Sequence, residues 1–118
     1  MNALSLRSYC LKKKGATEDL PFGDDVLVIR VASKMFALIK AEDGVFRINL
    51  KCDPAIALQL RRKYSSVTPG YHMNKKHWNS VYLDGSIPDE DIMQMVDHSY
   101  DLVFKGLKKS ERKLIEGF

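Results

Sequence analysis

The residues of this sequence that could take part in chemistry gather between Val67 and Asp84. This stretch reads V-T-P-G-Y-H-M-N-K-K-H-W-N-S-V-Y-L-D and includes the single Trp of the chain and a pair of adjacent Lys residues. Ammonium, amide and imidazole groups are donors that contact the phosphates of nucleic acids. The stretch therefore predicts a nucleic-acid contact from five polar side chains and the neighbouring Trp: Asn74, Lys75, Lys76, His77, Asn79 and Trp78.

Turn-forming residues predict how this stretch is displayed. Thr68-Pro69-Gly70 is typical of a turn, because Pro presets φ and Gly accepts a positive φ. Tyr71 to Asn74 is then expected as a short strand. His77 to Leu83 is expected as a longer strand that the Asp84-Gly85 turn ends. The sequence thus predicts a hairpin with a polar tip.

The tip of this hairpin has two interpretations. In the first, Lys75 and Lys76 project toward a phosphate backbone, and Trp78 braces the loop from the core or stacks on an unpaired base. In the second, the lysines form an ordinary solvated loop tip, and Trp78 and Tyr82 belong to the core. The residues alone favour the second interpretation.

A second basic cluster, Arg61-Arg62-Lys63, comes shortly before this stretch. It ends a predicted helix that begins at Asp53-Pro54, and cations there also complement the helix dipole. Ile56, Leu60 and Tyr64 are expected on the buried side of this helix. We expect Arg61, Arg62 and Lys63 to support the hairpin lysines in binding phosphates.

Charge is distributed in blocks along the chain, which carries a net charge of +4. From Pro54 to Leu83 there are five Lys or Arg residues and no acid, whereas Asp84 to Phe104 holds six acids and no Lys or Arg. Such blocks predict a polarised surface with one pole that attracts polyanions. The alternative is that the blocks neutralise each other in the folded protein.

Other chemistries lack their characteristic residue patterns. His72 and His77 do not have the spacing of a zinc-binding pair. Cys10 and Cys52 are isolated, so we expect reduced thiols, with a disulfide between them as the alternative. The sequence has no Gly-rich phosphate loop, nucleophile elbow or recognisable acid/base pair of carboxylates. We expect a non-catalytic protein without metal or cofactor.

The length and hydropathy of the chain predict one domain over residues 1–118. No apolar run reaches the length that spans a bilayer, and the N-terminus does not resemble a signal peptide. We therefore expect a cytoplasmic protein that does not enter membranes and is a monomer.

Periodicity predicts the elements that must position the site. Residues 3–14 are expected as a helix, 16–25 as a loop, and 26–31, 35–39 and 45–51 as strands of an antiparallel meander. In the last of these strands, Arg47 and Lys51 are expected to add positive charge to an open face. A long helix follows Ile87-Pro88. The prediction is a two-layer α+β domain, with an antiparallel sheet of about five strands and helices mainly on one face.

Several segments resemble the bacterial MmcQ/YjbR family, in the same order and across nearly the whole chain. These are P-F-G-D-D-V-L-V-I-R-V, N-L-K-C-D-P, V-T-P-G-Y-H-M-N-K-K-H-W-N, D-G-S-I-P and S-Y-D-L-V. The resemblance implies a CyaY-like (frataxin-like) α+β fold. It also implies DNA binding, by likeness to the "double wing" module of the phage transcription factor MotA. It supplies no catalytic residues.

The resemblance to frataxins does not extend to iron. Frataxins are linked to iron through an acidic first helix, whereas the first predicted helix here carries Arg7 and Lys12 to Lys14 and no acid. DNA or another nucleic acid is therefore the leading partner. The alternatives are a protein-interaction module, and a small-molecule or enzymatic pocket walled by His72, His77 and Trp78.

Overall fold

The computed structural model describes residues 1–117, which form one open sheet with four helices. The helices are α1 (Ala3–Leu11), α2 (Pro54–Lys63), α3 (Asp89–Lys105) and α4 (Lys109–Glu116). The strands are β1 (Ala16–Asp19), β2 (Val26–Val31), β3 (Lys34–Glu42), β4 (Val45–Lys51), β5 (Val67–Pro69) and β6 (Trp78–Tyr82). All neighbouring strands are antiparallel, in the order β1-β2-β3-β4-β6-β5. The predicted α+β class is confirmed.

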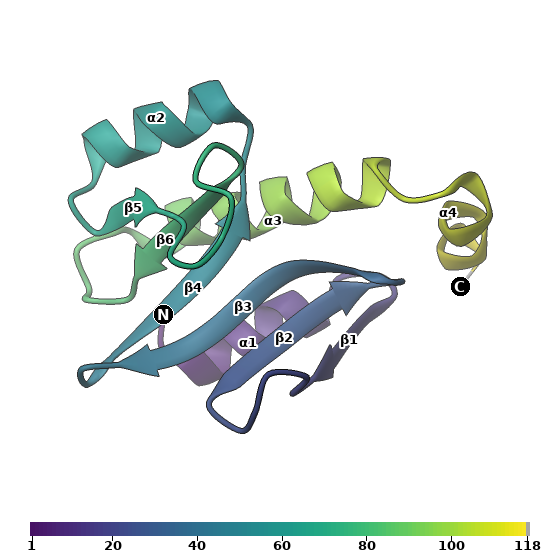
Figure 1. The fold of residues 1–118 in the computed structure, drawn as a ribbon, viewed down its shortest axis with the longest axis horizontal. Coiled ribbons are helices and arrows are strands. Elements are labelled where there is room, and N and C mark those ends of the chain that lie inside the picture. Colours follow the sequence, from purple (N-terminus) through teal and green to yellow (C-terminus); the bar gives the residue numbers. More distant parts are fainter. Residues whose placement is uncertain (118) are drawn as a thin grey trace.

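The core lies between the sheet and the two helices that share one of its faces, α1 and α3 (Figure 1). Leu6 of α1 and Val96 of α3 are fully buried against Ile29 and Ile48 of the central strands. Burying one such side chain is worth about 1.5–3 kcal/mol. Figure 1 also shows α2 beside β5 and β6, and α4 beyond the far end of α3. The helices are therefore mainly on one face, as predicted.

The sheet has six strands rather than about five, because residues 16–19 pair with β2 instead of forming a loop. β1 is an edge strand in which three of four residues are exposed. Arg7 of α1 forms an ion pair with Glu18, and Arg30 of β2 forms one with Asp19. The sequence did not predict this strand because residues 16–19 show no alternation of apolar and polar side chains.

The predicted strand from Tyr71 to Asn74 is wrong. The short partner of β6 is β5, which comes earlier in the chain and ends at Pro69. Because β5 lies at the edge of the sheet, it can include Pro, which has no N–H to donate to a neighbouring strand. Residues 70–77 form the irregular connection between β5 and β6, called the β5–β6 loop below.

The sequence predicted that the second face of the sheet is open at β4. In the structure this face is covered. Arg47 and Asn49 point away from the helices and yet are only 5% and 4% exposed. The β5–β6 loop covers them: the guanidinium of Arg47 lies 4.8 Å from the ring centroid of Tyr71. Arg47 also forms an ion pair with Glu42, so it adds no free charge to this face.

Candidate nucleic-acid interface

The β5–β6 loop begins at a position that only Gly can occupy. The N–H of Gly70 donates to the carbonyl of Trp78 at 2.8 Å, which brings the two backbones close together. A Cβ on Gly70 would lie 2.7 Å from Cβ of Trp78 and 2.9 Å from its carbonyl oxygen. These contacts are too short for any other residue without a shift of the backbone. Gly70 is therefore required for close approach rather than for positive φ.

The first half of the loop is attached to the sheet by a buried polar network. The backbone N–H of Tyr71 donates to Oγ of Ser80 at 2.9 Å, and Nδ2 of Asn49 donates to the carbonyl of Tyr71 at 3.3 Å. Oγ of Ser80 in turn donates to Oδ1 of Asn49 at 2.7 Å. Because these groups satisfy one another, the path of the loop over the second face is well defined.

The second half of the loop is shaped by Asn74. Its Oδ1 accepts from the backbone N–H of Lys76 at 3.0 Å, and its carbonyl accepts from those of His77 and Trp78. Such side-chain-to-backbone bonds are typical of Asn in turns. Both lysine side chains are exposed, and Nζ of Lys75 lies 3.2 Å from the carbonyl of Gly70. The loop thus presents two ammonium groups on a supported backbone.

The two basic clusters meet through Arg61 at the end of α2. Its Nε donates to Oδ1 of Asn79 at 2.8 Å, and its Nη2 donates to the carbonyls of Lys75 and Trp78. Hydrogen bonds from a charged donor are about twice as strong as neutral ones. Arg61 therefore holds the β5–β6 loop against the helix, and its guanidinium is largely used in doing so.

The other two members of the Arg61-Arg62-Lys63 cluster point in different directions. Arg62 is exposed, and among the described residues no carboxylate forms an ion pair with it, with Lys75 or with Lys76. Lys63 faces α3, where its Nζ lies 3.9 Å from a carboxylate oxygen of Asp91. The exposed cations of the candidate interface that form no ion pair among the described residues are thus Arg62, Lys75 and Lys76.

Three of the predicted contact residues are less accessible than expected. Asn79 is only 2% exposed and belongs to the interior, which corrects its assignment to the interface. Trp78 and His77 are half-buried, and the carbonyl of His77 accepts from the N–H of Cys52. Of the predicted residues, those exposed to a polymer are Asn74, Lys75, Lys76, Arg62 and Lys63.

The predicted pocket between His72, His77 and Trp78 is not formed. His72 borders a hollow on the second face of the sheet, together with Tyr71 and Phe22. Trp78 borders a different hollow near the end of α3. The structure therefore contradicts the alternative in which His72, His77 and Trp78 form the walls of one catalytic or ligand site. Within residues 1–117, no group of three or more His, Cys, Asp or Glu side chains could hold a metal ion.

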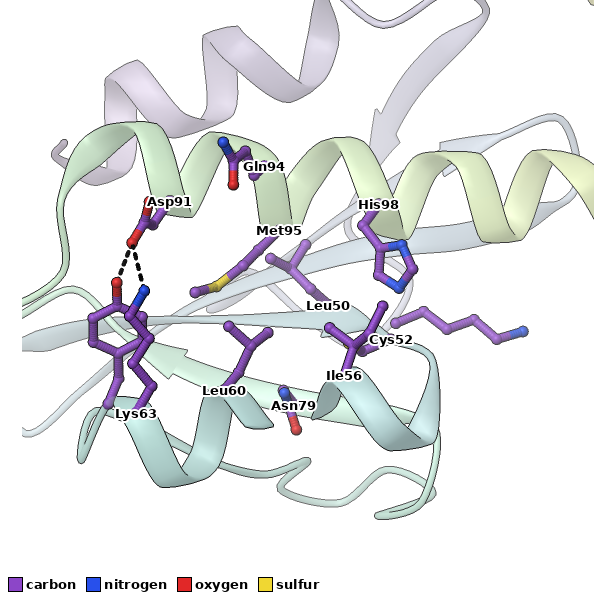
Figure 2. A pocket seen from close by; sticks show the side chains of 12 residues that line it. Leu50, Cys52, Ile56, Leu60, Lys63, Asn79, Asp91, Gln94, Met95 and His98 are labelled. Atoms are coloured by element: carbon purple, nitrogen blue, oxygen red, sulfur yellow. Dashed lines mark hydrogen bonds and ion pairs between the residues drawn. The ribbon is translucent and has the colours of Figure 1, made fainter. Parts of the chain in front are cut away.

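A cavity of about 300 Å³ between α2 and α3 was not predicted from the sequence (Figure 2). Ile56 and Leu60 line it from α2, where they were expected to be buried. Ile56 is instead 40% exposed, and the single buried residue of α2 is Ala57. Cys52 also borders the cavity, and burial raises the pKa of its thiol to about 11. Cys10 and Cys52 are both free thiols, so they form no disulfide with each other.

A strongly ionised carboxylate lies beyond β6, where the chain turns toward α3. Hydrogen bonds from Ser66 and Ser86 lower the pKa of Asp84 to about 2. This side chain therefore stays charged at any physiological pH and holds the turn.

No helix within the described residues combines the length and the hydropathy that crossing a bilayer requires.

Comparisons with known proteins agree with the resemblance found in the motifs. The protein YjbR of Escherichia coli strain K12 is 37% identical over 115 residues, which cover 98% of each chain. The protein YbdF of Escherichia coli O157:H7 is 41% identical over 95 residues, 80% of this chain and 78% of YbdF. The crystal structure of Deinococcus radiodurans protein DR2400, with a DUF419 domain, superposes with a TM-score of 0.88 at 41% identity. It covers 98% of this chain and 88% of that one. Because the YjbR family model also matches residues 11–102, the chain belongs to the YjbR family.

Proposed function

We propose that this protein binds nucleic acid, most simply duplex DNA, through the β5–β6 loop and the adjacent end of α2. The observation that carries the proposal is the contact between Arg61 and the carbonyl of Lys75. Through this contact the backbone of Lys75 lies against the end of α2, next in sequence to the exposed Arg62. Among the described residues, none of the exposed cations Arg62, Lys75 and Lys76 is neutralised by a carboxylate.

The chemistry of this edge supports contacts to phosphates rather than to bases. Lysine ammonium groups neutralise phosphates without reading sequence, and the planar guanidinium of Arg62 can contact a phosphate through two N–H groups. Each phosphate contact contributes about −0.9 to the slope of log K against log salt concentration on duplex DNA. Three contacts give a slope of about −2.7, so binding is weak and depends strongly on salt.

The test is a titration of a labelled duplex, followed by fluorescence anisotropy at about 50 mM and 200 mM salt. We expect the Lys75→Ala/Lys76→Ala variant to bind more weakly than wild type and to lose about two units of salt slope. The control is Lys108→Ala/Lys109→Ala, which removes two exposed lysines at the start of α4. If both variants lose the same affinity, only the net charge of the protein matters for binding, and the loop is not a specific interface. If the loop variant binds the duplex as tightly as wild type, the proposal is wrong.

A further inference from the structure

The cavity between α2 and α3 has the shape and the walls of a small-ligand site. Its volume of about 300 Å³ lies at the small end of the range for ligand pockets, which is roughly 300–1,000 Å³. Ile56 and Leu60 of α2 face Met95 of α3 across it, and Leu50 of β4 lies between them (Figure 2). These four residues form an apolar part of the lining and come from three different elements, while polar and charged side chains such as Lys63, Asp91 and His98 border the rest.

One polar side chain in this cavity has an unused donor. Asn79 is only 2% exposed, and its Nδ2 has no hydrogen-bond partner among the described residues. The bond to Arg61 determines how the amide of Asn79 is oriented. Nε of Arg61 is a donor, so its partner at 2.8 Å must be the amide oxygen Oδ1 of Asn79, which therefore faces Arg61. Nδ2 is therefore directed the other way, toward the cavity (Figure 2).

A buried donor without a partner destabilises the folded protein by about 1–3 kcal/mol, so native proteins almost always satisfy it. A buried water usually has two to four polar partners, whereas the residues beside Nδ2 in Figure 2 are apolar: Ile56 and Leu60. An organic molecule with an acceptor oxygen would satisfy the donor and cover these walls together. The arrangement suits such a molecule better than water.

The charges around the cavity favour an anionic acceptor. The guanidinium of Arg61 lies directly behind the amide of Asn79 and polarises it. Asp91 is the one acid among the lining residues, and its charge is shared with Lys63. The high pKa of the Cys52 thiol, about 11, keeps it protonated and so favours reversible binding over covalent capture.

We propose that this cavity binds a small carboxylic acid with an apolar body, whose carboxylate accepts a hydrogen bond from Nδ2 of Asn79. The apolar body lies between Ile56, Leu60 and Met95. The carboxylate is held at the floor of the cavity, with the positive charge of Arg61 behind it. This site is on the opposite side of α2 from the candidate nucleic-acid interface, so either proposal can fail without the other.

The binding experiment uses three probes of similar size on the intact protein: phenylacetate, phenylacetamide and toluene. Two-dimensional ¹H–¹⁵N NMR follows the side-chain amide of Asn79 and the backbone amides of Leu60 and Met95 during each titration. We expect saturable shifts of all three signals with phenylacetate at millimolar concentrations, weaker binding of phenylacetamide and the weakest binding of toluene. No saturable shift of these signals with phenylacetate would overturn the proposal.

Three variants then locate the ligand and its hydrogen bond. Asn79→Asp keeps the shape and the contact with Arg61 but turns the donor into an acceptor, so phenylacetate should bind at least about tenfold more weakly. Ile56→Trp should block the cavity, whereas Leu58→Trp makes the same kind of change at a residue that is 49% exposed and does not line it. Wild-type affinity in Asn79→Asp would refute the hydrogen bond, and equal affinity in the two Trp variants would refute the location.

Discussion

At the scale of single residues, Arg61 decides how the site is built. The sequence places it in a basic cluster, which is why we expected it to bind phosphates. In the structure its donors are directed to Asn79 and to the carbonyls of Lys75 and Trp78. A side chain that satisfies buried or half-buried acceptors contributes to stability first. Its effect on any ligand is then indirect, through the position of the loop and of the amide of Asn79.

We predict that Arg61→Ala lowers the free energy of unfolding by about 1.5–3 kcal/mol, because it leaves three acceptors without their charged donor. Urea unfolding followed by circular dichroism measures this loss. Arg62→Ala removes the neighbouring guanidinium, which is exposed and makes no hydrogen bond within the described residues. It should change stability by less than about 0.5 kcal/mol. Equal effects of the two substitutions would contradict the role given to Arg61.

At the scale of elements, the sequence predicted best where the apolar pattern was regular. The meander of β2, β3 and β4 and the long helix α3 were expected near their observed positions. β2 and β3 are nearly continuous apolar runs, apolar residues alternate along β4, and those of α3 recur with a period near 3.6. β1 was missed because it is polar and exposed, and its pairing with β2 is a backbone property. α2 was predicted as a helix, but no periodicity could show that Ile56 and Leu60 line a cavity instead of packing on a neighbour.

The candidate site was predictable to a similar extent. The basic residues near Lys75 and near Arg62 could be found by composition alone, and in the structure Arg61 of the second cluster contacts the backbone of Lys75. The roles of Arg61 and Asn79 could not be predicted, because they depend on one hydrogen bond between residues 18 positions apart in the chain.

One contact between elements predicts a pH dependence of stability. Lys13, just after α1, forms an ion pair with Asp97 of α3, and the hydroxyl of Tyr9 donates to the same carboxylate at 2.6 Å. Burial alone would raise the pKa of Asp97, but the bonds from Lys13 and Tyr9 outweigh it and lower the pKa below 3.8. Since the folded pKa is lowered, the stabilisation is present above about pH 4 and is lost as pH falls through the folded pKa.

We therefore predict that Asp97→Asn lowers stability at pH 7 by up to about 1 kcal/mol, a value limited by the partial exposure of the pair. The difference from wild type should shrink as the pH falls below about 4, because Asp97 of the wild type is then protonated first in the unfolded and, at lower pH, in the folded protein. Chemical unfolding at several pH values measures it. Asp24→Asn, in the exposed loop before β2, should show no such convergence. A difference that stays constant between pH 7 and pH 3 would contradict the assignment.

At the scale of the whole molecule, the charge blocks of the sequence are only partly neutralised by folding. Lys63 meets Asp91 where α2 and α3 approach each other across the cavity (Figure 2). On the other side of α2, Arg62 and the two loop lysines have no such partner within residues 1–117. The fold thus separates an acidic helix start from a cationic edge by the width of one helix. Asp91 is the acid that most directly limits the extent of that edge.

This arrangement predicts that Asp91→Asn strengthens DNA binding. Removing the carboxylate leaves Lys63 without an ionic partner, so it can provide one more phosphate contact and steepen the salt slope by about 0.9. The anisotropy titration used for the loop variant measures both quantities. Asp101→Asn makes the same change in net charge on an exposed part of α3 that forms no ion pair among the described residues. If both substitutions raise the affinity equally, only the net charge matters. A steeper slope for Asp91→Asn alone places the polyanion at the end of α2.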